Sequence, residues 1–128
     1  MKTVRLSRGQ RRDLQGDTGE VAESIAADEY GYNQFITSDY FDAKRKDTGA
    51  IIEVKSCLSE LASGQKGRFR VFEGQHKKLV RADRDGSANY VFVLFDVSGQ
   101  PTAKLIRKNP ATVGRLVGAR GGFYASGH

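Results

Sequence analysis

The chain has 128 residues, enough for one domain with a single core that buries roughly two thirds of the unfolded surface. It carries 21 lysines and arginines against 15 aspartates and glutamates, and the resulting formal charge of +6 favours a polyanionic partner. The single cysteine, Cys57, excludes an internal disulfide and a cysteine–histidine zinc cluster. No apolar run is long enough to span a membrane, and the N-terminus lacks the apolar core of a secretory signal. We therefore expect a cytoplasmic protein that makes no membrane contact.

The first part of the chain is predicted to contain an arm and a helix. Residues 1–15 are polar, arginine-rich and without a clear period, so we expect a basic flexible arm that becomes ordered on a polyanion. Residues 16–128 then form the single folded domain, which ends in a flexible glycine-rich tail. The first helix is predicted from about Thr18 to Glu29, because Gly31 can serve as its C-terminal stop.

The middle of the chain is predicted to form a β-hairpin that gathers three ionisable side chains. Strands are expected over residues 32–37, 40–45 and 50–56. Gly49 can adopt the positive φ that a tight turn requires, so Asp42 on one strand comes alongside Glu53 on the next. Alternate side chains of a strand share a face, which places Lys55 beside Glu53.

The grouping of Asp42, Glu53 and Lys55 indicates a cation site beside an ammonium group, which is the chemistry of phosphodiester cleavage. Two close carboxylates repel each other unless a proton or a cation lies between them, and Mg²⁺ prefers such oxygen ligands. We expect Mg²⁺, with Mn²⁺ as a substitute, bound by Asp42, Glu53, the backbone carbonyl of Val54, water and a phosphate oxygen. Lys55 would hold the attacking water against the phosphate.

This arrangement resembles the PD-(D/E)xK nuclease superfamily, with Asp42 as the first acid and Glu53–Lys55 as the ExK element. Phe41 replaces the usual proline before the aspartate. Within the superfamily, the chain is most similar to archaeal-type Holliday-junction resolvases, whose first helix opens with the Gly-x-x-x-Glu element that Gly16–Glu20 matches. The resemblance covers residues 16–97. It implies that Glu20 is a further catalytic acid and metal ligand, and that the active protein is a symmetric homodimer.

Simpler interpretations of the same residues remain open at this stage. Glu53 and Lys55 alone can be a solvated ion pair worth under about 1 kcal/mol. Asp17 followed by Glu20 is also a capping-box-like helix start, so Glu20 can simply satisfy backbone N–H groups. Glu23, one turn later, is the substitute candidate for the acid from this helix.

After the hairpin, a loop and a second helix are expected. Residues 59–67 contain small polar side chains and two glycines, which suit either a substrate-contacting lid or a plain surface connection. The helix is predicted over about residues 73–82, with Gln75 near its start. In many members of the resembled superfamily a glutamine or lysine at a comparable place contacts the metal-bound water or a phosphate, and the alternative is a surface amide. His76 is expected to be exposed rather than a ligand.

The C-terminal part completes the sheet. Residues 90–95 are continuously apolar, which is typical of a central strand covered on both faces. Residues 102–107 form an outer strand, and Asn109-Pro110 starts a short helix. Residues 118–124 are expected to be flexible.

The predicted fold class is therefore α/β: a restriction-endonuclease-like core with a central mixed sheet flanked by helices. Basic residues cluster along the chain and suit contacts with DNA phosphates, the alternative being a merely soluble basic surface. The candidates are Arg8, Arg11, Arg12, Lys44, Arg45, Lys46, Lys66, Arg68, Arg70, Lys77 and Lys78. We expect a Mg²⁺-dependent DNA endonuclease that acts on branched DNA, the four-way junction. The alternatives are a restriction, nicking or repair endonuclease, or a non-catalytic nucleic-acid-binding module.

Overall fold

The computed structural model describes residues 1–14, 18–36, 38, 40–60, 64–65, 67–84, 86–119 and 122. In chain order the elements are β1 (Lys2–Arg5), α1 (Arg8–Asp13), α2 (Thr18–Tyr30), β2 (Gln34–Phe35), β3 (Ala43–Lys44), β4 (Ile51–Leu58), α3 (Glu73–Ala82), β5 (Ala88–Asp96), β6 (Thr102–Lys108) and α4 (Pro110–Ala119). Among the described residues, no helix is both long and apolar enough to cross a membrane.

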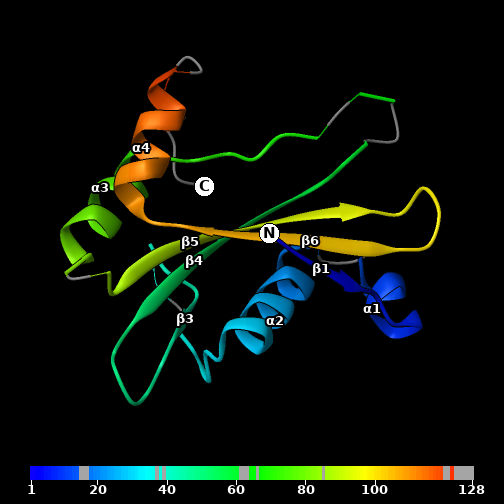
Figure 1. Ribbon diagram of the computed structural model, residues 1–128, viewed down its shortest axis with the longest axis horizontal. Coiled ribbons are helices and arrows are strands. Elements are labelled where there is room, and N and C mark those ends of the chain that lie inside the picture. Colours follow the sequence, from blue (N-terminus) through cyan, green and yellow to red (C-terminus); the bar gives the residue numbers. More distant parts are fainter. Residues whose placement is uncertain are drawn as a thin grey trace.

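The strands form one mixed sheet between two layers of helices. Over the described part of the chain, its order is β1-β6-β5-β4-β3-β2. Among the described strands, only β4 and β5 pair in parallel, which requires the crossover through α3, and the other neighbouring strands are antiparallel. Helices α1 and α2 lie below the sheet in Figure 1, and α3 and α4 lie above it. This architecture confirms the α/β, restriction-endonuclease-like fold class that the sequence predicts.

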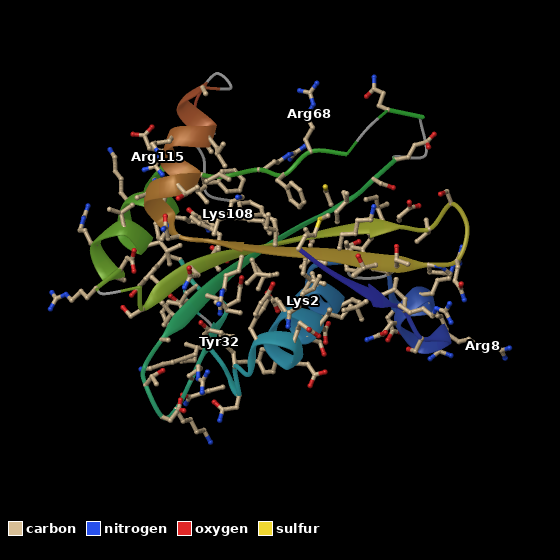
Figure 2. All side chains as sticks on the ribbon, in the orientation of Figure 1. Lys2, Arg8, Tyr32, Arg68, Lys108 and Arg115 are labelled. Atoms are coloured by element: carbon tan, nitrogen blue, oxygen red, sulfur yellow. The ribbon has the colours of Figure 1, made fainter. Side chains whose placement is uncertain are left out.

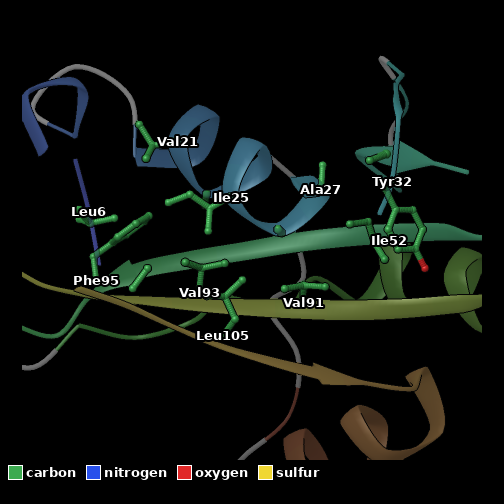
Figure 3. Close-up of a cluster of buried hydrophobic side chains, with 14 residues drawn as sticks. Leu6, Val21, Ile25, Ala27, Tyr32, Ile52, Val91, Val93, Phe95 and Leu105 are labelled. Carbon is green, nitrogen blue, oxygen red and sulfur yellow. The ribbon is translucent and has the colours of Figure 1, made fainter. Parts of the chain in front are cut away.

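The alternation of side chains along β4 and β5 gives the sheet two apolar faces. Ile52, Val91 and Val93 pack below the sheet against the apolar side of α2, which includes Ile25 (Figure 3). On the other face a smaller cluster includes Leu79 of α3 and extends to α4. Because β5 is covered on both sides, the continuous apolar run predicts its central position correctly.

The N-terminal segment is not the flexible arm that its composition predicts. Residues 2–5 form β1, which pairs with β6, and Leu6 is buried in the lower core. Ser7 and Gln10 then form a capping box that starts α1. The correction has a simple physical reason: β6 offers an unpaired edge, and two apolar side chains, Val4 and Leu6, suffice to anchor a short edge strand.

Several element boundaries also differ from the predicted ones. β2 and β3 have two residues each, and β5 extends over Ala88–Asp96. The helix over residues 73–82 is confirmed. α4 continues through Ala119, so residues 118 and 119 are helical rather than part of a flexible tail, while most of the later tail lies outside the described residues.

The connection between β4 and α3 passes close to the end of β4. Gly67 lies so near this strand that a Cβ atom at its position would come within 1.8 Å of the Leu58 carbonyl oxygen. Its N–H donates to the Ser59 carbonyl at 3.3 Å. Residues 61–63 and 66 of the predicted lid or surface loop lie outside the described residues. Position 67 therefore requires a glycine, because any larger residue would clash with the backbone at the end of β4.

Candidate active site

The β3–β4 hairpin brings Asp42 to the middle of β4. Gly49 has φ +76°, as the turn requires, and its N–H donates to the Arg45 carbonyl at 2.9 Å. Asp42 precedes β3, and its N–H donates to the Ile52 carbonyl at 2.8 Å. The predicted hairpin is therefore present and places Asp42 next to the residue before Glu53.

The Asp42 side chain lies where the pairing between β3 and β4 stops. β3 pairs only with Ile51 and Ile52, although β4 continues to Leu58. Asp42 Oδ2 accepts a hydrogen bond from the Val54 N–H at 2.7 Å. The carboxylate thus takes the place of a strand partner at this edge, and the rest of β4 extends beyond the short β3.

Glu53 is buried against Asp42. Only 6% of its surface is exposed, and the two carboxyl groups share a side-chain hydrogen bond. Burial, followed by the hydrogen bond and charge of Asp42, raises the pKa of Glu53 to about 9, while Lys55 opposes the shift. In the absence of a cation, the carboxyl pair therefore keeps a proton at neutral pH.

Lys55 completes the cluster, on the same face of β4 as Glu53. Its Nζ lies 4.0 Å from Glu53 Oε2 and donates a hydrogen bond to Gln75 Oε1 of α3 at 3.0 Å. It also lies over the Phe72 ring, 4.9 Å from the centroid. With 13% of its side chain exposed, Lys55 is a fixed and largely desolvated ammonium group, held from both β4 and the start of α3.

Of the two candidate acids on α2, the alternative one, Glu23, influences the pKa of Glu53. Glu20 is exposed, whereas Glu23, one turn later, is half-buried and its charge contributes to the raised pKa of Glu53. The substitute candidate therefore lies within electrostatic range of the carboxyl pair. A catalytic or metal-binding role for Glu20 stays a prediction.

Sequence reasoning missed a polar pair beneath Glu53. Tyr90 of β5 is the register partner of Glu53, and its hydroxyl lies 3.0 Å from His76 Nδ1 of α3. Burial raises the pKa of Tyr90, and the neighbouring Glu53 charge adds to this effect. His76 is buried rather than exposed as expected, and burial lowers its pKa. The sequence around neither residue indicates the pair, because their contact depends on the parallel register of β4 and β5 and on the packing of α3.

The carboxylates of Asp42 and Glu53 suit a hard divalent ion that is held by few protein ligands. Among the described residues, no group of three or more histidine, cysteine, aspartate or glutamate side chains lies close enough to bind a metal. Asp42 and Glu53 nevertheless form a carboxyl pair that retains a proton, which a cation can replace. Mg²⁺ is commonly held by one or two carboxylates together with water and substrate phosphates. Coordination by the Val54 carbonyl stays a prediction.

The predicted DNA-contacting residues do not form one patch. Arg8 of α1 and Arg68 lie on opposite sides of the sheet in Figure 2. Arg45 is paired with Asp47 at 2.9 Å, and Lys77 with Glu73 at 2.9 Å. Lys66 lies outside the described residues. The remaining candidates follow their elements: Arg11 and Arg12 on α1, Lys44 and Lys46 at the hairpin, Arg70 before α3 and Lys78 on α3.

Comparison with known proteins gives one match. A family model described as a PD-(D/E)XK nuclease superfamily domain matches residues 9–128. No curated protein and no solved structure shows a significant match to the chain. The match spans α2, the β3–β4 hairpin, α3 and strands β5 and β6, whereas β1 lies before its first residue.

Proposed function

Because the chain belongs to the PD-(D/E)XK nuclease superfamily, we propose that Asp42, Glu53 and Lys55 form its active site for DNA hydrolysis. Nucleases of this superfamily use divalent metal ions, so the domain is a metal-dependent nuclease whose substrate is DNA. The observation that carries the proposal is a carboxyl pair, of which Glu53 is buried and Asp42 half-buried, beside a fixed ammonium group on the part of β4 beyond its pairing with β3.

Each residue has a distinct role in the proposed reaction. Asp42 and Glu53 hold Mg²⁺, or Mn²⁺ in its place, and Glu20 or Glu23 adds negative charge from α2. When bound by these carboxylates, the ion would supply an acidified water and would offset charge on the phosphate oxygens. Lys55 orients the attacking water by hydrogen bonds from Nζ, and its charge stabilises the phosphate as the P–O bond breaks.

Gln75 acts as a positioning residue in this scheme. We predicted either a contact with the metal-bound water or a phosphate, or a surface amide; in the structure its Oε1 accepts a hydrogen bond from Lys55 Nζ at 3.0 Å. An ammonium group on a flexible four-carbon side chain loses rotational freedom when it is held in this way. Gln75 therefore keeps Lys55 aimed at the phosphate.

We further propose that the substrate is branched DNA, a four-way junction cut by a homodimer. The resemblance of Gly16–Glu20 to the resolvase element supports this choice. The placement of Arg8 and Arg68 on opposite sides of the sheet also suits DNA that bends around more than one face (Figure 2). A restriction, nicking or repair endonuclease would use the same site chemistry.

The cytoplasmic location expected from the sequence stays a prediction.

A non-catalytic binding module is the second candidate. The hydrogen bond from the Val54 N–H to Asp42 Oδ2 stabilises the hairpin whether or not a metal binds. Under this alternative, the protein binds DNA with the usual salt dependence but cuts nothing.

A competition experiment separates these functions. Labelled four-way junction and linear duplex are mixed with the protein in Mg²⁺ and then in Ca²⁺, and the products are mapped on both strands. Paired symmetric incisions near the branch, in Mg²⁺ only, are expected. Cleavage confined to one linear sequence would favour a restriction enzyme, and binding without cleavage of either DNA would favour the non-catalytic module.

The active-site assignment needs its own variants. Asp42→Asn should abolish cutting while DNA binding stays within about twofold of the wild type. Asp96→Asn is the matched control, because Asp96 contacts Ser98 at the exposed turn after β5. If Asp42→Asn cuts at the wild-type rate, the role of this carboxylate is wrong.

A further inference from the structure

We propose that a cavity separate from the carboxyl pair binds a phosphate-bearing nucleotide unit. The cavity has a volume of about 490 Å³. It lies at the end of the sheet where the β3–β4 turn and the start of β5 meet. Six side chains carry the argument: Tyr32, Arg45, Thr48, Ser87, Asn89 and Arg107.

The cavity lies on the face of the sheet opposite Glu53. Asn89 pairs in register with Ile52, and Arg107 pairs with Val91, both of which belong to the lower core beneath the sheet. Tyr32 follows the end of α2 and lies near Ile52 in Figure 3. Glu53 lies beside Tyr90, which packs in the cluster on the upper face of the sheet that includes Leu79 of α3. A ligand in this cavity therefore does not touch the proposed catalytic groups.

Two guanidinium groups converge on this cavity. Arg107 hydrogen-bonds the Tyr32 hydroxyl, and the charges of Arg107 and Arg45 both act on that hydroxyl. Arg107 also stacks on the Tyr30 ring, 4.9 Å from its centroid. Like charges that share a site repel each other, and a phosphate between them would relieve this repulsion through charge-assisted hydrogen bonds.

The rest of the lining adds neutral polar groups and, among the described residues, no acid. Thr48 Oγ1 accepts a hydrogen bond from the Ala50 N–H, and a hydroxyl that accepts can also donate its own hydrogen. Asp47 accepts hydrogen bonds from Arg45 Nε at 3.1 Å and from Nη2 at 2.9 Å, and it does not line the cavity. This exposed pair orients Arg45 and offsets part of its charge, whereas Arg107 faces the cavity beside the Tyr32 hydroxyl.

The walls of the cavity are fixed by hydrogen bonds between elements. The Lys46 N–H donates to Asn33 Oδ1 at 3.1 Å, which ties the hairpin to the segment after α2. Asn89 Nδ2 donates to the Gly86 carbonyl at 3.3 Å. The volume lies in the range of small-molecule sites, about 300–1,000 Å³. It therefore accommodates the sugar and base of a nucleotide as well as its phosphate.

The ligand chemistry is shared by a free nucleotide and by one unit of a DNA strand, so the experiment has two arms. The wild-type protein, without divalent metal, is titrated with dAMP and separately with a short DNA duplex while its backbone-amide NMR signals are followed. We expect saturable shifts at Thr48, Ser87 and Asn89 in at least one arm. Arg107→Gln should weaken this binding at least about tenfold.

Arg115→Gln is the matched control, since Arg115 lies on α4 on the other side of the sheet (Figure 2). It should leave the affinity unchanged. Arg45→Gln repeats the test if Arg107→Gln fails to fold. Shifts with dAMP identify a free-nucleotide site, and shifts with duplex alone identify a strand contact.

The inference is overturned if neither ligand shifts these amides. Equal weakening by Arg115→Gln, or full affinity in both cavity variants, overturns it as well. Because no metal is present and no bond is cut, a failure of the proposed nuclease activity leaves this test unaffected.

Discussion

Replacing Glu53 with glutamine is expected to remove a pH dependence from the folding stability of the metal-free protein. The folded protein keeps a proton on the Asp42–Glu53 pair, because burial and the neighbouring carboxyl raise the pKa of Glu53 from 4.5 to about 9. The unfolded chain has no such environment. Below pH 4.5 both states are protonated, so the difference in stability arises only above that pH.

The sign and size of the effect follow from proton linkage. Between pH 4.5 and about 9 the unfolded chain has released the proton and the folded protein has not, so stability falls as the pH rises. The slope is at most about 1.4 kcal/mol per pH unit, or about 2 kcal/mol between about pH 7 and pH 8.5. Starting near pH 7 avoids the titration of His76, whose pKa is lowered by burial.

Urea unfolding in EDTA at these two pH values measures the effect. The wild-type protein should lose stability over this interval, and Glu53→Gln should lose much less. Glu73→Gln is the control, because Glu73 is an exposed residue of α3 paired with Lys77. Equal slopes for the wild type and Glu53→Gln would refute the shared proton, and so would a wild-type stability that rises over this interval.

Four further substitutions test the positioning of the site and the packing around it. Gln75→Leu should slow single-turnover cleavage by about tenfold or more at unchanged DNA affinity, because Lys55 loses a charge-assisted hydrogen bond; an unchanged rate would remove Gln75 from the scheme. Ile52→Ala should cost about 2–5 kcal/mol in urea unfolding, since Ile52 is fully buried, and a loss well under this range would contradict its place in the core. Gly67→Ala should cost about 1–3 kcal/mol, because its Cβ would meet a β4 carbonyl. Gly74→Ala, with open space around it, should be neutral or gain up to about 1 kcal/mol, and equal effects of the two alanines would refute the close approach.

The hairpin was accessible from the sequence because its signals are local. Alternation along β4 fixes the common face of Glu53 and Lys55, and a glycine at the turn allows the tight connection. The distance along the chain between Asp42 and Glu53 is short. The short connection therefore allows few strand registers, and these bring Asp42 close to Glu53.

The parts that sequence reasoning missed depend on tertiary contacts. The pairing of Glu53 with Tyr90 is set by a parallel register across a crossover, and no local pattern encodes it. The choice between Glu20 and Glu23 depends on how α2 is rotated against the sheet. The first strand, β1, forms because β6 provides a partner, so its own composition indicates only a polar arm.

Hydrolysis of DNA by Lys55 together with the carboxyl pair is tested most directly by the single-turnover cleavage rate of Lys55→Ala in Mg²⁺. We expect a loss of at least about a hundredfold at nearly unchanged DNA affinity, with correct folding shown by circular dichroism. Lys104→Ala, which removes an exposed lysine from β6, should cut at the wild-type rate. Wild-type cleavage by Lys55→Ala would contradict the account.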